Sequence, residues 1–397
     1  MDATWLLILL PLAAGSGWFA ATRARSRSRL RRQVDSLPSA YFRGLNFLLN
    51  EQHDKALEIL VTALEQDKDT VEVQLALGSL FRKRGEIQRA TRIHQNLVAR
   101  TQLDQSQRVQ ALYELAQDYY KAGLLDRAEH LLVEISGVED LQESAQQLLL
   151  QIYEQEKEWE NSIRVARNLE KIIGINLATT ISQYHCEIAE NAITEGRYGT
   201  AFSSIQEAML VDQSCTRAII QAGRLKAIQG DHRGAIDDWT TGIGEHREFP
   251  GEIAELIGNS YRRIRALDEY HRFLKKALKQ NRDVRLALAL TETLREVQSD
   301  AVAEQFLLSW VRSNPSLQGL HRLIQLRMTK TGAEESEDLG LLEKLIGRIV
   351  EEEIGYECRH CGFRGKVMHW QCPGCRKWNT TFLRRQRERI SKLVDPL

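Results

Sequence analysis

The sequence predicts an all-α fold made of repeated helix pairs, with a membrane-spanning helix before them and a small cysteine-rich module after them. The 397 residues include only 6 prolines and 25 glycines, fewer turn residues than a sandwich or barrel of short strands requires. Glycine and alanine recur at a fixed spacing through the middle of the chain, and four of the six cysteines cluster near its end. With 43% hydrophobic and 27% charged residues, the composition excludes wholesale disorder.

An uncharged stretch stands at the beginning of the chain. The twenty residues from Ala3 to Thr22 carry no charge, and Trp5 and Trp18 lie near the two ends of this stretch. A helix of that length, at about 1.5 Å per residue, just spans the roughly 30 Å hydrocarbon layer of a membrane. We therefore predict a transmembrane anchor over residues 1–22.

A basic juxtamembrane segment, residues 23–34, follows the anchor. It holds six arginines, whereas Asp2 is the only charged side chain before them. The chain balances 54 basic against 54 acidic residues, so residues 1–34 carry +5 and the remainder −5. Basic flanks stay on the cytoplasmic side, so we expect the amino terminus outside and the bulk of the chain in the cytoplasm. The alternative, a cleaved secretory signal, would carry its positive charge before the apolar stretch.

The middle of the chain, residues 35–315, repeats itself. Glycine precedes alanine by five residues at Gly85 and Ala90, and the same spacing starts at Gly123, Gly196 and Gly230. The full series of alanine positions has successive intervals of 34, 38, 34, 39, 34, 35 and 33 residues, and its members are Ala56, Ala90, Ala128, Ser162, Ala201, Ala235, Tyr270 and Ala303. This period is that of tetratricopeptide repeats, which stack into a right-handed superhelix with a concave groove.

Two further positions recur in register with the alanine series. Small residues stand twelve before it, as at Gly78 and Gly223, and bulky residues stand nine before it, as at Phe81. A small residue lets the two helices of a pair approach, and a glycine five before the alanine ends the first helix in a left-handed conformation. Repeat four lacks that glycine, and repeat seven has Tyr270 at its alanine position.

The groove of such a superhelix binds other proteins, and its predicted lining is mostly polar. First-helix residues that directly follow the small position face the groove in this architecture. The candidate partner-binding residues are Gln117, Gln151, Glu190 and Arg224. Any solvated helix face has a similar composition, which is the alternative interpretation of each side chain. After Pro315, residues 316–353 are predicted to form a closing helix pair that covers the last repeat.

The strongest chemical motif lies in residues 354–382, where two CxxC pairs are separated by ten residues. Its members are Cys358, Cys361, Cys372 and Cys375. Four thiolates at this spacing suit one tetrahedral metal ion, and a reducing cytosol disfavours disulfides. A redox CxxC would need a βαβ context, which the surroundings lack. His360 and His369 are interpreted as bystanders, and Cys186 and Cys215 as isolated, buried small hydrophobic residues.

The two CxxC hooks resemble the knuckles of rubredoxin. Tyr356 stands two residues before the first cysteine and Gly362 directly follows the second. The chain departs from rubredoxin in two respects, because Arg376 stands where a glycine normally follows the fourth cysteine and because the knuckles are closer in sequence. The resemblance implies one bound iron or zinc ion, and thiolate ligation alone does not distinguish the two metals.

The order of anchor, arginine segment, repeats and rubredoxin-like knuckles resembles the lipopolysaccharide assembly protein B family of Gram-negative inner membranes over the whole chain. This resemblance implies a non-enzymatic adaptor in which the metal module packs against the repeats and both parts are required. The partners it implies are a membrane AAA+ protease, the deacetylase that commits precursor to lipid A and is degraded by that protease, and other lipopolysaccharide synthesis or transport proteins. Oligomerisation is compatible with it.

Two other functional classes remain open from the residues. The first is a nucleic-acid-binding zinc ribbon, suggested by the basic C-terminal tail, residues 383–397, with its bases Arg384, Arg385, Arg387, Arg389 and Lys392. The net acidic charge of the chain after residue 34 argues against it. The second is a rubredoxin-type electron carrier, which the missing glycine at position 376 weakens. No GxxxxGK[ST], HExxH, GxSxG or helix-opening GxGxxG motif is present, so the sequence offers no signature of an enzyme.

Overall fold

The structure is a computed structural model that describes residues 70–245, 250–328, 335–353 and 355–383, together with eight single residues between positions 43 and 59. The chain divides into two compact units, residues 1–156 and residues 157–397, and each is described by itself. The predicted anchor over residues 1–22, the basic segment 23–34 and most of the tail lie outside the described residues. No helix within the described part of the chain is long and apolar enough to cross a membrane.

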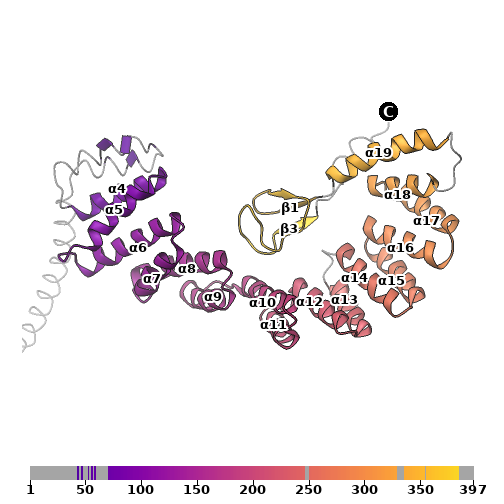
Figure 1. The fold of residues 1–397 in the computed structure, drawn as a ribbon, viewed down its shortest axis with the longest axis horizontal. Helices are drawn as coiled ribbons and strands as arrows, with labels where there is room; N and C mark the ends of the chain where they lie inside the picture. The colour runs from indigo at the N-terminus through magenta and orange to yellow at the C-terminus, as the bar shows by residue number, and fades with distance from the viewer. Residues whose placement is uncertain are drawn as a thin grey trace, which may run out of the picture. The chain divides into compact units, whose positions relative to one another are not determined.

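The described part of the first unit consists of helices that pack in sequential pairs. Helix α4 packs against α5, α5 against α6, and α6 against α7 (Figure 1). The described elements of this unit are α4 (Val71–Lys83), α5 (Ile87–Val98), α6 (Gln105–Lys121), α7 (Leu125–Ile135), the 3₁₀ turn η1 (Glu139–Leu141) and α8 (Gln142–Glu156).

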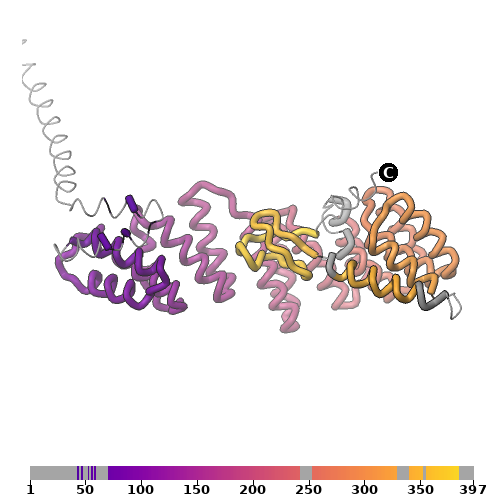
Figure 2. The backbone as a smooth tube through the Cα atoms, turned by 90° about the horizontal axis from the view of Figure 1, so that it is seen from above, coloured from indigo at the N-terminus to yellow at the C-terminus, as the bar shows by residue number. Residues whose placement is uncertain are grey.

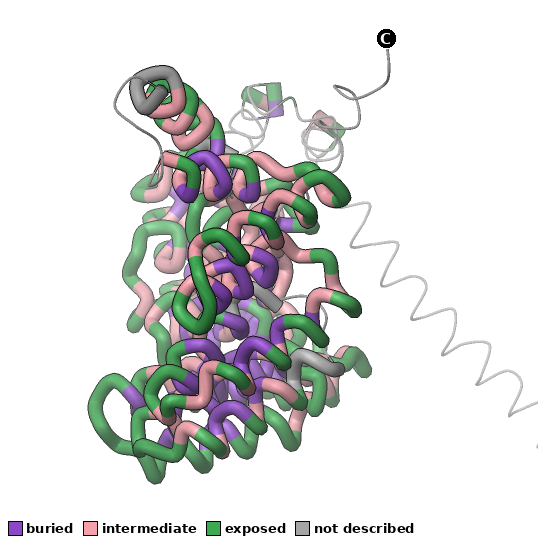
Figure 3. The backbone as a smooth tube through the Cα atoms, turned by 90° about the vertical axis from the view of Figure 1, so that its right-hand side faces the viewer, coloured by how far each residue is buried: buried purple, intermediate pink, exposed green. Residues whose placement is uncertain are grey.

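The described part of the second unit contains further helix pairs followed by a small sheet. Its helices are α9 (Trp159–Ile173), α10 (Ala178–Thr194), α11 (Tyr198–Val211), α12 (Thr216–Ile228), α13 (His232–Glu245), α14 (Pro250–Arg263), α15 (Leu267–Gln280), α16 (Val284–Val297), α17 (Asp300–Ser313), α18 (Leu317–Met328) and α19 (Glu335–Glu353). Helices α10, α12, α14, α16 and α18 each contact the next member of this series, so they form one continuous layer. Buried residues gather where neighbouring helices meet (Figure 3).

In two helix pairs, the space beside a glycine on the first helix is filled by a bulky ring from the second helix of the same pair. A Cβ atom on Gly78 would lie 2.3 Å from Nε2 of His94, and one on Gly223 would lie 2.3 Å from Nε1 of Trp239. The Trp239 ring also donates a hydrogen bond from Nε1 to the carbonyl oxygen of Ile220, at 3.1 Å. The absence of a side chain at the small position therefore lets a ring from the second helix pack there, in addition to letting the two helices approach closely.

Repeat seven satisfies the same rule with a tyrosine. A Cβ atom on Gly258 would lie 2.7 Å from the hydroxyl of Tyr270, and that hydroxyl donates to the carbonyl oxygen of Ala254 at 2.8 Å. Burial raises the pKa of Tyr270, so the hydroxyl stays protonated as a donor. The unexpected tyrosine in the alanine series is thus accommodated by the glycine on the facing helix.

In repeats two to seven the turn between the two helices of a pair has a left-handed residue whether or not glycine is present, whereas Gln298, at the same position of repeat eight, has φ of −123°. The φ angles are +84° at Gly85, +77° at Gly123, +75° at Gly196 and +88° at Gly230. Where glycine is missing, Lys157 has φ of +60° and Arg265 has φ of +56°. In these six repeats the helix pair therefore imposes the turn geometry, and glycine only lowers its conformational cost.

A three-stranded antiparallel sheet follows α19. The central strand is β1 (Tyr356–Cys358), with β2 (Arg364–Gly365) on one side and β3 (Thr381–Leu383) on the other. Within the second unit this sheet lies on the side of the even-numbered helices, as Figures 1 and 2 show. Stacked helix pairs with a small three-stranded module at their end confirm the corresponding parts of the predicted fold.

Candidate metal centre

Two turns of the same design present the cysteines. In the first, the backbone N–H of Gly362 donates to the carbonyl of Cys358 at 2.9 Å, and the N–H of Cys358 donates to the carbonyl of Phe363 at 2.8 Å. The second turn repeats both bonds, from Arg376 to Cys372 at 2.8 Å and from Cys372 to Lys377 at 3.0 Å. Each turn therefore directs its two cysteines toward the same point.

The departure from the rubredoxin pattern at Arg376 leaves the backbone of the second turn intact. Gly362 has φ of +74° and Arg376 has φ of +56°, so both turns end in the left-handed conformation. For a non-glycine residue that conformation costs about 1–2 kcal/mol, which the favourable interactions of the surrounding turn must offset. The missing glycine thus changes the energy of the second knuckle and leaves its geometry unchanged.

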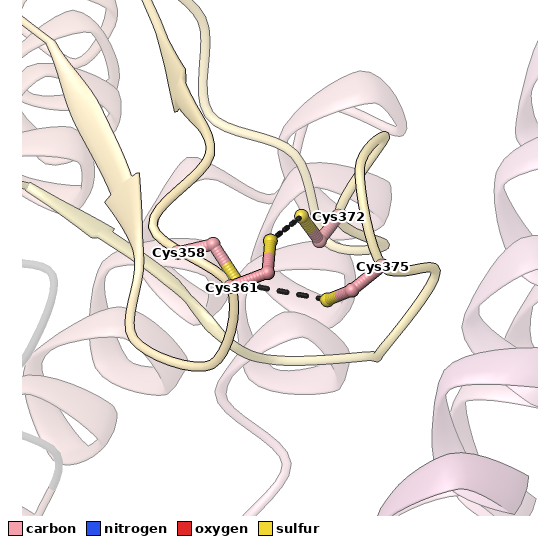
Figure 4. Close-up of side chains that lie close together, drawn as sticks. All are labelled: Cys358, Cys361, Cys372 and Cys375. Carbon is pink, nitrogen blue, oxygen red and sulfur yellow. Dashed lines mark hydrogen bonds between the residues drawn. The ribbon is translucent and has the colours of Figure 1, made fainter. Parts of the chain in front are cut away.

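The four sulfur atoms fit one tetrahedral metal ion. All four Sγ atoms lie within 4.8 Å of one another, with 3.7 Å between Cys358 and Cys375 and 3.6 Å between Cys361 and Cys372 (Figure 4). A tetrahedral centre with metal–sulfur bonds of about 2.3 Å has sulfur–sulfur edges of about 3.8 Å. His360 and His369 are not members of this group. Either iron or zinc is compatible with four thiolates.

The electrostatics of the cluster favour a bound cation. Burial acts to raise the pKa of the Cys358 thiol, but hydrogen bonding with the Thr380 side chain and with the backbone N–H groups of Cys361 and His360 outweighs it and lowers that pKa to about 6. At Cys361 a backbone N–H bond from Phe363 lowers the pKa, but burial and the neighbouring thiols outweigh it and raise the pKa to about 12. Four thiolates in this space repel one another, and a divalent cation removes that repulsion.

An aromatic cluster fixes the module on the repeat helices. Trp378, three residues after Cys375, is buried against Trp159 at the start of α9 and Tyr184 in α10. The Trp378 ring centroid lies 6.0 Å from that of Trp159 and 5.7 Å from that of Tyr184, both edge-on. The docking that the family resemblance implies is therefore present in the structure.

A second contact joins the module to α12. The guanidinium of Arg217 lies over the ring of Trp370, 5.7 Å from its centroid, and also donates to Glu187 of α10 at 2.7 Å. Met368, Trp370 and Phe382 pack against the apolar core formed by α13 to α17. Sequence reasoning missed these docking residues. The one available signal was the position of Trp370 and Trp378 beside the second CxxC pair.

The candidate partner-binding residues lie in different places. Gln117 is in α6 and Gln151 in α8, both in the first unit. Glu190 of α10 and Arg224 of α12, in the second unit, face each other at 3.2 Å. The structure brings this last pair together, and the partner-binding role of all four residues stays a prediction.

Ion pairs of this kind link α10 to α12, α14 to α16 and α16 to α18 in the second unit. Their partners are 30 to 34 residues apart in sequence, which is one repeat. The pairs are Arg217–Glu187, Arg224–Glu190, Arg262–Glu296 and Arg322–Glu292. The polar lining predicted from the sequence therefore consists in part of side chains that already neutralise one another.

The two remaining cysteines correct one expectation. Cys186 and Cys215 are both buried, as predicted, but they are not isolated. Their Sγ atoms lie 3.7 Å apart, and Cys215 stands at the N-cap of α12 rather than inside a helix. The stacking of α12 on α10 brings them together, which the sequence separation of 29 residues did not reveal.

Comparison with known proteins places these features in a family. Residues 356–381 match the family described as "Rubredoxin metal binding domain". The chain is 32% identical over 378 residues to lipopolysaccharide assembly protein B of Escherichia coli (strain K12), covering 94% of this chain and 96% of that protein. It is 30% identical over 387 residues to lipopolysaccharide assembly protein B of Haemophilus influenzae (strain ATCC 51907 / DSM 11121 / KW20 / Rd), with the same coverage of 94% and 96%.

Solved structures show weaker similarity. A chain in the structure of Naa15/Naa10 bound to HypK-THB matches 79% of this chain and is matched over 46% of its own length, at 12% identity and a TM-score of 0.45. A thermophilic TPR protein of Thermus thermophilus matches 64% of this chain over 97% of its own length, at 18% identity and a TM-score of 0.21.

Proposed function

This chain belongs to the lipopolysaccharide assembly protein B family, and on that premise we propose that it is a membrane-anchored adaptor that regulates lipopolysaccharide biosynthesis. In this proposal it promotes degradation of the deacetylase that commits precursor to lipid A, by a membrane AAA+ protease. A role in gathering lipopolysaccharide synthesis and transport enzymes is compatible with the same surface. The observation that carries the proposal is the relationship over 94% of the chain, which includes both the repeats and the metal module.

The packing of the module on the repeats supports an adaptor with one rigid recognition surface. Trp378 fixes the module on α9 and α10, and Arg217 joins it to α12. The metal ion, when bound, supplies structural cross-linking of four thiolates and no reaction chemistry. Because so small a module has little core of its own, ligation is a main source of its stability.

Attachment to the inner membrane is part of the proposal and rests on the sequence of residues 1–34. An anchored adaptor meets membrane-confined partners at a much higher effective concentration than a freely diffusing one. We infer that the amino terminus faces the periplasm and the repeats face the cytoplasm, because arginines follow the apolar stretch.

The proposal is tested by measuring the half-life of the deacetylase in cells that carry the wild-type chain, the double substitution Cys372→Ser and Cys375→Ser, or the substitution Lys366→Gln as a matched control on the exposed module surface. The cysteine variant is expected to lose metal and to lengthen the half-life, whereas the Lys366 variant is expected to behave as wild type. An unchanged half-life in the cysteine variant would remove the metal module from the mechanism.

Crosslinking in membranes, followed by mass spectrometry, identifies the partners directly. Recovery of the protease and the deacetylase supports the adaptor. Salt-sensitive binding of RNA or DNA by the purified chain would instead favour a nucleic-acid-binding protein. A ferric thiolate absorption that cycles reversibly with an electron donor would favour an electron carrier.

A further inference from the structure

Helix α19 has an apolar face that its packing against α18 does not cover. It contacts α18 through the opposite side, where Val350 is buried and Glu343 accepts a hydrogen bond from His321 at 2.9 Å. Four apolar side chains elsewhere on α19 are exposed: Leu341 by 59%, Leu342 by 48%, Leu345 by 46% and Ile349 by 45%. At 3.6 residues per turn they fall within an arc of about 100°. A continuous apolar stripe of this kind indicates a contact surface.

The sheet of the metal module brings the start of the C-terminal tail close to the end of α19. Strand β1 begins at Tyr356, three residues after the last residue of α19, and Tyr356 pairs with Leu383, the last residue of β3. Because the two strands are antiparallel, α19 and the tail join the sheet at the same end. Leu383, from which residues 384–397 continue along the chain, therefore lies at the same end of the sheet as the helix that carries the apolar stripe.

The tail has an apolar pattern that matches the stripe in spacing and in distance along the chain. Ile390, Leu393 and Val394 follow the i, i+3, i+4 spacing of one helix face. Ile390 lies seven residues after Leu383, and Ile349 lies seven residues before Tyr356. The eleven residues after Leu383, which end at Val394, would span about 16 Å as a helix and about 36 Å when extended. In either form the tail is long enough to run back along α19.

The charges of the two segments are complementary in the same alignment. Residues 335–353 contain seven acids and two bases, with glutamates at 351, 352 and 353, and the last turn of α19 has no basic residue. Residues 384–397 contain five bases and two acids, and four arginines stand at its beginning. Acids at a helix C-terminus are unfavourable with the helix dipole, and adjacent bases relieve this. The arginines would meet the glutamates where the two segments leave the sheet.

We propose that residues 384–397 dock on α19 of the same chain, with Ile390, Leu393 and Val394 against the stripe formed by Leu341, Leu342, Leu345 and Ile349. The docked tail covers the apolar face at the end of the repeats and ties α19 to both ends of the metal module. This accounts for the basic tail by an internal contact, without nucleic acid.

Site-specific photo-crosslinking in the full-length chain, kept in membranes, tests the proposal. A photoreactive phenylalanine analogue replaces Leu345 on the stripe or, as a matched control, Lys344, which is also exposed but lies on another side of α19. Chains labelled with ¹⁴N and ¹⁵N are mixed before irradiation. We expect position 345, and not position 344, to crosslink to a tail peptide with the same isotope label. Mixed labels would assign the face to a second copy of the chain, and crosslinks to other proteins or to lipid without tail peptides would assign it to them; each result would overturn the proposal.

Hydrogen exchange provides a second measurement that does not depend on crosslinking yield. Replacing Ile390, Leu393 and Val394 by serine preserves the length and charge of the tail. Because the contact is apolar, we expect this variant to speed exchange in the peptide that covers residues 341–349 by about tenfold and to leave α10 to α16 unchanged. The single substitution Ser391→Ala serves as the control and is expected to have no effect. Identical exchange in the wild-type and triple-serine chains would refute the docking.

Discussion

The ring of Trp378 stands edge-on to the ring of Trp159, with 6.0 Å between the centroids and 77° between the planes. One ring belongs to the metal module and the other to the first turn of a repeat helix, and 219 residues separate them in sequence. Aromatic pairs in this geometry contribute about 0.5–1.5 kcal/mol beyond the area that they bury. The contact therefore joins two parts of the chain that different forces hold together, metal ligation in one and helix stacking in the other.

The substitution Trp378→Ala is expected to release the module from the repeats while the metal stays bound. A buried tryptophan replaced by alanine costs about 3–5 kcal/mol, and Trp378 supplies no thiolate. Limited proteolysis between α19 and the module should accelerate, whereas the metal content measured by mass spectrometry should be unchanged. Trp378→Phe retains an aromatic ring and should stay close to wild type. Loss of metal from Trp378→Ala would show that this ring supports the knuckle itself.

The substitution Gly223→Ala is expected to destabilise the second unit by about 1–3 kcal/mol, the usual cost of overpacking. The new Cβ would lie 2.3 Å from Nε1 of Trp239, whose ring is buried and hydrogen-bonded to Ile220. Gly199→Ala is the matched control, because Gly199 is also helical but has nothing within 4 Å of the added Cβ. That variant should gain about 0.5–1 kcal/mol. Urea unfolding of both variants measures whether the free energy of unfolding falls or rises. Equal effects would contradict the packing of the Trp239 ring into the space beside Gly223.

The substitution Arg376→Gly is expected to strengthen the second knuckle by about 0.5–1 kcal/mol, because glycine adopts positive φ without steric cost. Metal transfer to a competing chelator should slow accordingly. Gly362→Ala, at the equivalent position of the first knuckle, should speed it, since φ there is +74°. If both variants released metal faster than wild type, the arginine side chain would have a role that its backbone conformation does not explain.

Stability of the second unit is expected to fall as the pH falls below about 6.5, the ordinary pKa of histidine. Burial lowers the pKa of His185, the nearby Arg167 lowers it further, and Glu207 opposes both. The folded state therefore binds fewer protons than the unfolded state in this range. The contribution of neutral His185 to stability is complete above the pKa that this histidine has in the unfolded state, and it is lost as the pH falls toward the lower pKa that it has in the folded state. Urea midpoints measured at several pH values should show a smaller dependence for His185→Gln. An identical dependence in both proteins would assign the titration to another group.

The parts of the fold that follow a period were predictable from the sequence. The 34-residue spacing located the helix pairs, and two CxxC pairs located the module. Repeats four and seven lack the turn glycine, yet Lys157 and Arg265 have the same left-handed turn there, because the packing of a helix pair outweighs a local cost of about 1–2 kcal/mol.

The contacts that depend on tertiary stacking were not predictable. Trp159 and Tyr184 follow the ordinary pattern of buried helical residues, and nothing in their spacing indicates that a distant module covers them. Cys186 and Cys215 likewise meet only because α12 packs on α10. Periodicity encodes which side of a helix is buried but does not identify what lies against it.

The ion pairs between successive first helices affect how binding experiments on this protein should be designed. Removing Arg224 alone leaves Glu190 with an uncompensated charge and also loosens two adjacent repeats, so weaker binding of a partner would have two causes. Exchanging the charges, with Glu190→Arg and Arg224→Glu together, preserves the tether between α10 and α12 while reversing the field that an incoming protein meets. Because these side chains already stabilise the stacking of the repeats, any role in partner binding is best measured with reciprocal charge swaps rather than with single truncations.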